Sequence, residues 1–190
     1  MEILYALIKS DDIPGNDMKL FEHSLSNILI SISEKNKNIT YKKGCKSCAH
    51  IHIVLAKQRT LDHIFPHTDL NFSWTDQKSN FIMFSYENWK NMYLHEDNTF
   101  YQKYVIIHEF LHAFPFYQNH NKNTCNENSE YNVMYQQTRN SYPKNKIKPN
   151  HCNNKRLVIP DNMKLHDFDY ENNRKHKKDM YQKYITAMKK

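Results

Sequence analysis

The stretch YVIIHEFLH, residues 104–112, decides how this sequence of 190 residues is interpreted. His108 and His112 are four residues apart, and residues at this spacing lie on the same face of a helix. Both imidazoles can therefore bind one zinc ion. Glu109 is placed to reach a zinc-bound water and to act as its general base. The pattern predicts a zinc site on a helix over residues 99–113; two ordinary helical histidines are the alternative interpretation.

A catalytic zinc site has a third protein ligand and keeps its fourth position open for water. His120, in the segment after the helix, is the favoured third ligand. Gln118 is the alternative, although a neutral amide is a poorer zinc ligand than imidazole. Glu127 and Glu130 are further candidates, because carboxylates also bind zinc.

The sequence from His108 onward resembles the metzincin pattern HExxHxxGxxH. In that pattern a glycine breaks the helix and a third histidine follows three residues later. Here Pro115 stands at the glycine position and Gln118 at the histidine position. Proline cannot adopt the positive φ of a glycine, but it disfavours helix at the preceding Phe114 and so ends the helix by another route. A longer loop can then bring His120 to the metal.

The resemblance continues beyond the helix, loosely over residues 1–152 and well over 101–138. Residues 132–135 resemble the Met-turn of metzincins, whose methionine, here Met134, packs beneath the metal. A closer resemblance is to a bacterial metzincin-like family of unknown function, with a helix YxxYVxNHExGHxLGxxH, a cysteine loop and a segment VMQQQT, here VMYQQT at 133–138. It implies an α/β (α+β) fold with a twisted mixed sheet, a backing helix and an active-site helix.

Hydrophobic periodicity predicts the individual elements. Strands are expected at residues 2–9, 39–41, 51–55 and 81–84, and helices at 17–33, 99–113 and from about 171 to the end. A short turn or helix is expected at 88–94, and residues 56–79 and 140–162 are expected to be irregular. We expect residues 1–165 to form the catalytic domain and 166–190 a basic helical tail.

The resemblance identifies residues 51–56 as an edge strand beside the cleft. An extended protein or peptide substrate can pair with an edge strand, which would place its scissile carbonyl at the metal. The expected activity is that of a zinc metalloendopeptidase, a hydrolase. The alternative is an inactive zinc-binding protein with a structural or interaction role, motivated by the lost glycine and the displaced third histidine. A component of a large DNA virus is one such role, because the composition, with two glycines, is typical of an AT-rich genome.

The four cysteines are Cys45, Cys48, Cys125 and Cys152. The residues alone leave disulfides, thiols and a second, structural zinc site open. The resemblance implies a Cys125–Cys152 disulfide, because cysteines flank the Met-turn in that family. Cys45 and Cys48 remain open between a tight disulfide, a redox pair, half of a zinc site and two unpaired thiols.

The net charge of +7 is concentrated toward the C-terminal segment. A basic tail attracts nucleic acid, acidic protein or an anionic membrane, which raises the hypothesis of a protease acting on DNA-bound proteins. A solvated lysine-rich helix is the favoured interpretation. No stretch is long and apolar enough to span a membrane, and the acidic N-terminus does not resemble a signal peptide. We therefore expect an intracellular or virion-associated protein.

Overall fold

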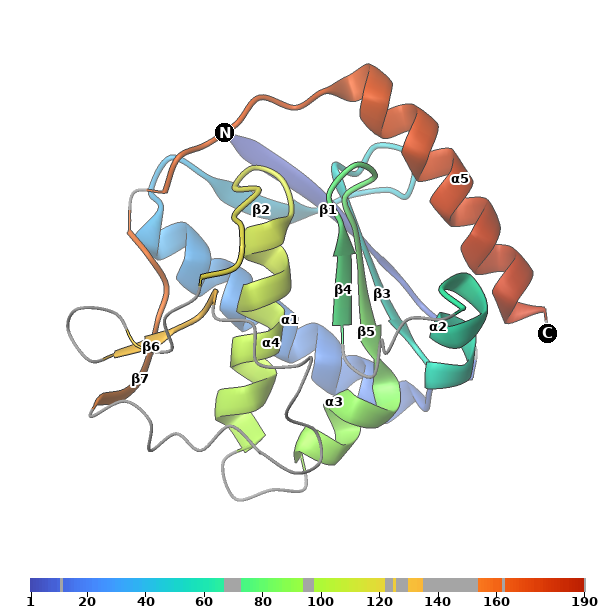
Figure 1. Cartoon of the computed structure of the whole chain (residues 1–190), viewed down its shortest axis with the longest axis horizontal. Helices are drawn as coiled ribbons and strands as arrows, with labels where there is room; N and C mark the ends of the chain where they lie inside the picture. Colours follow the sequence, from blue (N-terminus) through green and yellow to red (C-terminus); the bar gives the residue numbers. More distant parts are fainter. Residues whose placement is uncertain are drawn as a thin grey trace.

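A five-stranded sheet with helices on both faces organises the molecule (Figure 1). The computed structural model describes residues 1–10, 12–66, 73–93, 98–121, 125, 130–134, 154–161 and 163–189. Its elements are β1 (Glu2–Ile8), α1 (Gly15–Lys35), β2 (Thr40–Lys43), β3 (Ile51–Ala56), α2 (Gln58–Ile64), β4 (Ser73–Asp76), β5 (Phe81–Ser85), α3 (Tyr86–Tyr93), α4 (Asn98–His112), β6 (Glu130–Asn132), β7 (Asn154–Val158) and α5 (Tyr170–Met188). The expected α+β class with a mixed sheet is confirmed.

The strand order is β2-β1-β3-β5-β4, in which β4 runs antiparallel to β5 and the other pairs are parallel. All six residues of β3 are buried, as expected of a central strand covered on both faces. The prediction that residues 51–56 form the edge strand is therefore wrong. At the end of the sheet next to β5, the edge is formed by β4.

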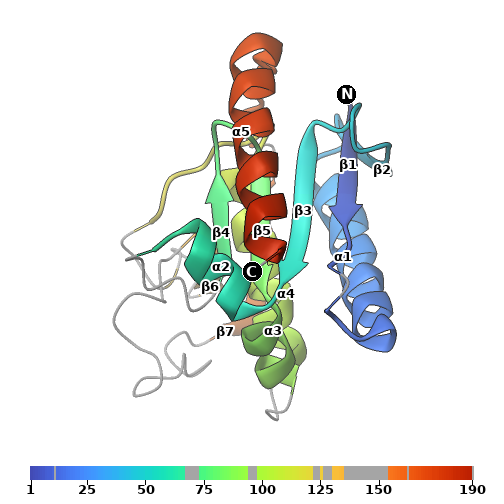
Figure 2. The same ribbon diagram turned by 90° about the vertical axis from the view of Figure 1, so that its right-hand side faces the viewer.

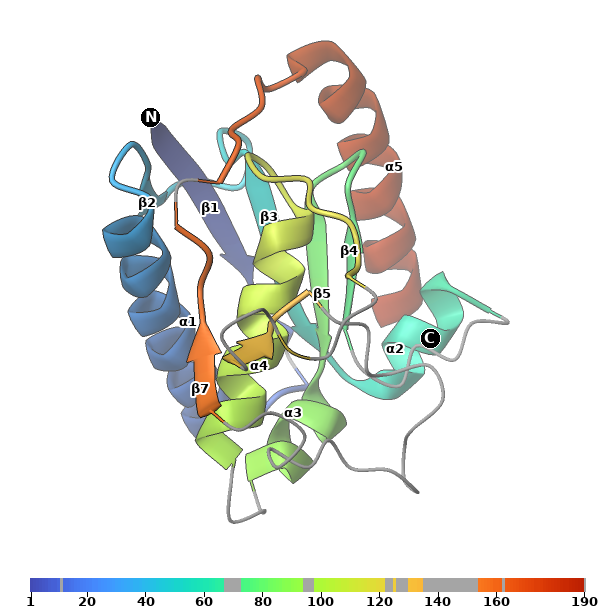
Figure 3. The ribbon, with the colours of Figure 1, turned by 60° about the vertical axis from the view of Figure 1, so that its left-hand side comes forward.

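Helices α1, α3 and α4 cover one face of the sheet (Figure 3). Successive side chains of a strand point to opposite faces, so alternate residues of β1 and β3 contribute to this layer. On α1, Phe21 and Leu25 are four residues apart and fully buried, and the Phe21 ring meets Phe84 of β5 edge-on at 5.2 Å. Packing against this apolar layer determines which side of α4 faces the sheet.

Helices α2 and α5 cover the opposite face (Figure 2). Met180, Tyr184 and Ala187 of α5 pack in one apolar cluster with Val54 and Met83 of the sheet. The basic C-terminal helix therefore contributes to a core instead of extending away from it. Within the part of the chain that the structure describes, none of the helices has the length and apolarity needed to cross a bilayer.

The prediction of irregular structure at 56–79 and 140–162 is wrong where α2, β4 and β7 lie. Distant partners stabilise these short elements. The first N–H of α2, from Gln58, donates to the Glu87 carboxylate at 2.7 Å, 29 residues away. Pairing with β5 forms β4, and in the turn between them Ser79 N–H donates to the Asp76 carboxylate at 3.2 Å.

Candidate metal centre

Three histidine side chains meet where α4 ends. His108 and His112 come from the helix, and His120 comes from the loop that follows. Their Nε2 atoms are 3.1 Å apart for His108–His112, 3.2 Å for His108–His120 and 3.0 Å for His112–His120. Nitrogens bound to one tetrahedral zinc ion at 2.0–2.1 Å would lie about 3.3–3.4 Å apart. Each side of the triangle of Nε2 atoms is therefore within about 0.4 Å of the separation that a zinc ion requires.

A backbone carbonyl holds the far side of each helical ring. His108 Nδ1 lies 2.7 Å from the carbonyl oxygen of Val133, and His112 Nδ1 lies 2.7 Å from that of Gln118. A carbonyl can only accept, so each Nδ1 carries the proton and each Nε2 keeps its lone pair. Such outer hydrogen bonds fix the tautomer and orientation of metal-binding histidines. The donor set therefore fits zinc in chemistry as well as in spacing.

Burial keeps the two helical imidazoles neutral. It lowers the pKa of His108 to about 3, and the charge of the neighbouring His112 adds to the effect. Burial also lowers the pKa of His112. Because protons and metal ions compete for the same lone pair, these low pKa values leave both nitrogens available at neutral pH.

Gln118 contributes its backbone, and its side chain points elsewhere. The side-chain amide donates to the carbonyl of Phe116 at 3.3 Å. Of the two candidates for the third ligand, the structure brings His120 to the triangle and not the Gln118 amide. Glu127 and the side chain of Glu130 lie outside the described residues.

The chain reaches the third histidine through a turn that needs no glycine. The helix ends at His112, ahead of Pro115, as the sequence predicts. The residue with positive φ is Tyr117 (φ 47°), two positions after the proline. The backbone N–H of Gln118 then donates to the carbonyl of Leu111 at 2.8 Å, which returns the chain to the end of the helix.

Asn80 joins this turn to the hairpin between β4 and β5. It is fully buried and adopts a positive φ of 52°, a conformation that asparagine tolerates better than most residues. Its side-chain oxygen accepts from the N–H of Phe114 at 2.9 Å, and its amide donates to the hydroxyl of Tyr117 at 3.2 Å. The role of Asn80 was not predicted from the sequence. Its position after Ser79 in a polar stretch is a turn signal, but the signal does not name the partner.

Glu109 follows His108 on α4, and its carboxylate reaches β4. The side chain is buried, and its Oε2 accepts from the hydroxyl of Thr75 at 2.6 Å. Burial raises the pKa of Glu109 to about 7, against the opposing effect of the Thr75 hydrogen bond. A carboxyl whose pKa lies near neutrality is suited to both accepting and returning a proton. The role of Thr75 was not predicted from the sequence, because residues 56–79 were expected to be irregular.

The turn that contains Met134 braces the centre from outside the helix. Its Val133 carbonyl accepts from the ring of His108. Its Met134 carbonyl accepts at 2.7 Å from the N–H of Asn121, the residue after His120. Met134 itself is buried in the core beside these groups. One short segment therefore orients both a helical ring and the backbone next to the loop histidine.

The other predicted features are only partly described. Cys125 is disulfide-bonded, so it does not offer a thiolate to a second zinc site. Its expected partner Cys152 lies outside the described residues, as do residues 135–138 of the VMYQQT segment. Cys45 and Cys48 are free and exposed.

Comparison with models of known protein families and with curated proteins gave no match for this chain. Among the described residues, the three histidines are the one group of His, Cys, Asp or Glu side chains arranged closely enough to hold a metal ion.

Proposed function

We propose that this protein is a zinc-dependent metallopeptidase of metzincin-like type. His108, His112 and His120 are assigned as zinc ligands and Glu109 as the general base. The observation that carries this proposal is the triangle of Nε2 atoms, 3.0–3.2 Å on each side. Three protein ligands with an open fourth position are typical of catalytic zinc sites, whereas structural sites have four. The buried Met134 in the bracing turn further supports the metzincin-like assignment.

In this proposal Glu109 moves the proton that hydrolysis requires. Zinc, when bound, would polarise the scissile carbonyl and lower the pKa of the attacking water. The Glu109 carboxylate takes a proton from this water while the water oxygen attacks the carbonyl carbon. It then delivers that proton to the leaving amine nitrogen and returns to its starting state. Thr75 holds Oε2, so we assign the proton transfer to Oε1.

The proposed substrate is an extended peptide bound along β4. Among the described residues β4 pairs with β5 on one side, and its other side is an edge of the sheet. Edge strands present N–H and C=O groups that can pair with an added strand. Thr75 belongs to β4 and contacts Glu109, so a peptide on this edge would pass the general base. We therefore assign the substrate to β4 in place of residues 51–56.

The test measures metal content and peptide hydrolysis on the same preparations of the full chain. The wild type should bind one zinc ion at this centre and cleave members of a mixed peptide library. Glu109→Gln should keep the zinc and lose cleavage, whereas Glu171→Gln, an exposed carboxylate on α5, should change neither. A wild type without zinc, or cleavage by Glu109→Gln at the wild-type rate, would refute the proposal.

A second candidate is a zinc-binding protein without catalytic activity. The observation that favours it is that the centre is assembled from separate segments. The ligands and their hydrogen-bond partners come from α4, from the loop to Asn121 and from the turn at Met134. An ion at the triangle would tie these segments together. In that case zinc removal would lower the unfolding temperature equally in the wild type and in Glu109→Gln, and neither would cleave peptides.

A further inference from the structure

Cys45 and Cys48 form a compact pair in a single turn between β2 and β3. Both are exposed free thiols. The N–H of Cys45 lies 3.0 Å from the Cys48 sulfur, and the N–H of Cys48 lies 3.1 Å from the Cys45 sulfur. The two side chains also hydrogen-bond to each other. The turn thus holds both sulfurs side by side.

Gly44 provides the space for this pair. It is one of two glycines in the chain. A Cβ at this position would lie 3.3 Å from the Cys48 sulfur and 3.3 Å from Cβ of Leu4, which is tighter than nine in ten real contacts of a Cβ atom. A residue with a Cβ at this position would therefore require the Cys48 sulfur and Leu4 to shift by a few tenths of an ångström.

Side chains from two neighbouring elements fix the turn. The side chain of His52 on β3 is buried, with 1% of it exposed. Its Nε2 lies 2.7 Å from the backbone carbonyl oxygen of Lys46, a residue that lies between the two cysteines in the sequence. Lys177 of α5 donates to the carbonyl of Ala49 at 2.6 Å. Burial lowers the pKa of Lys177, and attraction to Cys48 in its thiolate form opposes this. The thiols therefore lie in an anchored turn beside a positively charged group.

The surroundings make the two thiols unequal. Hydrogen bonds from Cys48 and Ser47 lower the pKa of Cys45 to about 7, whereas the bond to Cys45 raises the pKa of Cys48. At pH 7 about half of Cys45 is then thiolate, while Cys48 stays protonated. Exchange with a disulfide requires this arrangement: one thiolate that attacks and a second thiol close by.

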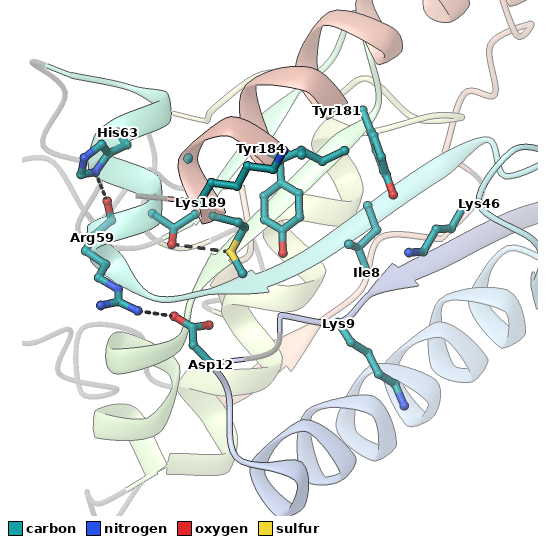
Figure 4. Close-up of a pocket in the computed structure, with 13 residues that line it drawn as sticks. Ile8, Lys9, Asp12, Lys46, Arg59, His63, Tyr181, Tyr184 and Lys189 are labelled. Atoms are coloured by element: carbon teal, nitrogen blue, oxygen red, sulfur yellow. Dashed lines mark hydrogen bonds and ion pairs between the residues drawn. The ribbon is translucent and has the colours of Figure 1, made fainter.

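A positively charged groove begins at Lys46 and runs along α5 (Figure 4). Its volume is about 540 Å³, and its lining includes Lys9, Lys46 and Lys189. The single carboxylate in the lining, from Asp12, is paired with Arg59 at 3.1 Å. The groove therefore keeps a net positive charge and attracts anions to the side of the turn where Lys46 lies.

We propose that Cys45 and Cys48 are a redox-active dithiol that exchanges with anionic disulfides. The Cys45 thiolate attacks one sulfur of the incoming disulfide, forms a mixed disulfide and releases one thiolate. Cys48 then loses its proton and attacks the Cys45 sulfur, which forms the internal disulfide and releases the second thiolate. The protein loses two electrons and two protons, and the incoming disulfide is reduced to two thiols.

The test exposes the full-length, zinc-containing protein to glutathione disulfide at pH 7 and maps the remaining thiols by alkylation and mass spectrometry. The wild type should form the internal Cys45–Cys48 disulfide. Cys48→Ser should accumulate glutathione on Cys45, because the second thiol is missing. Cys45 should react about three times faster than a cysteine in an unfolded peptide. Its lower pKa raises the fraction of thiolate at pH 7 roughly 16-fold, but it also makes each thiolate roughly fivefold less nucleophilic.

Two results would overturn the dithiol assignment. One is stable glutathione adducts on both cysteines of the wild type with no internal disulfide. The other is a second zinc ion that is lost in Cys45→Ser and blocks oxidation, which would make the pair a metal site.

The preference for anionic disulfides has its own control. Lys46→Met should slow the reaction with glutathione disulfide by up to about fivefold. This factor corresponds to the attraction between two unit charges roughly 4 Å apart in water. It should leave the reaction with neutral hydroxyethyl disulfide unchanged. Lys178→Met, an exposed lysine on α5, should change neither rate. Equal slowing with both disulfides would show that charge plays no part.

Discussion

The two faces of the sheet carry sites built in different ways. On the α4 side, the proposed functional groups in the helix are buried or half-buried, and each is held by a second group: carbonyls hold His108 and His112, and Thr75 holds Glu109. On the α5 side, the backbone of the turn is anchored, but the reactive groups Cys45 and Cys48 are exposed. Binding a metal requires three atoms at fixed separations, whereas thiol exchange requires access to one sulfur.

The largest effect that tests this contrast should come from the proposed general base. Glu109→Gln keeps the shape and the Thr75 contact but cannot accept a proton. We expect kcat for a cleaved peptide to fall about 10²–10⁴-fold, the usual contribution of general base catalysis, with unchanged zinc content. Activity within about threefold of wild type would show that the buried carboxylate is not the base.

The next largest effect concerns the third ligand. Zinc bound by four ligands contributes about 10–16 kcal/mol, so loss of one ligand should cost about 3–4 kcal/mol, or roughly 10²–10³-fold in affinity. His120→Ala should show this loss in competition with a chelator. Gln118→Ala keeps the carbonyl that holds His112 and should stay close to wild type. Equal losses in both variants would contradict the observed triangle.

The burial of Glu109 can be tested by pH in the metal-free protein. Its pKa is raised to about 7 in the folded state, compared with about 4.3 when unfolded. Between these values the folded state binds more protons, so this group makes folding less stable as pH rises. Relative to Glu109→Gln, the wild type should lose about 3 kcal/mol of unfolding free energy from pH 4 to pH 8.

Urea unfolding of both proteins at each pH gives this difference directly. The lowered pKa of His108 acts in the opposite direction, but it is common to both proteins and largely cancels. A difference that does not change with pH would mean that the Glu109 carboxyl is solvated.

The smallest effect is expected on the α5 side. Arg59 is 69% exposed in its ion pair with Asp12, and exposed ion pairs contribute about 0–1 kcal/mol. Arg59→Met should therefore change the unfolding free energy by less than about 1 kcal/mol and leave zinc affinity unchanged. Met180→Ala, on the same side but buried, should cost about 2–5 kcal/mol and serves as the positive control. A large loss in Arg59→Met would mean that the groove is part of the core.

Local patterns in the sequence were sufficient to predict the helix of the candidate metal centre. The spacing of His108 and His112 and the nearby His120 identify the three histidines that the structure brings together. The long elements were also predictable, because α1 and α4 bury many residues of one continuous segment. That Pro115 ends the helix could be predicted from the sequence. That the positive φ lies at Tyr117, and not at the position of the proline, could not.

Contacts between distant segments could not be predicted in the same way. The start of α2 depends on Glu87, and the carboxylate of Glu109 depends on Thr75, which is 34 residues away. The carbonyl of Val133 holds His108 across 25 residues. A backbone carbonyl carries no sequence signal, since any residue can supply it. The outer hydrogen bonds of a metal centre are therefore harder to predict than its ligands.

Asn80 connects two parts of the proposed site: the strand β4, on which the substrate would bind, and the loop that carries the third ligand. One buried amide holds the turn that follows β4 and, through Phe114 and Tyr117, the chain that leads to His120. Under the proposed function, this attachment links the affinity for the peptide to the affinity for zinc. Whatever factor a bound ion adds to peptide binding, a bound peptide adds to the affinity for the ion.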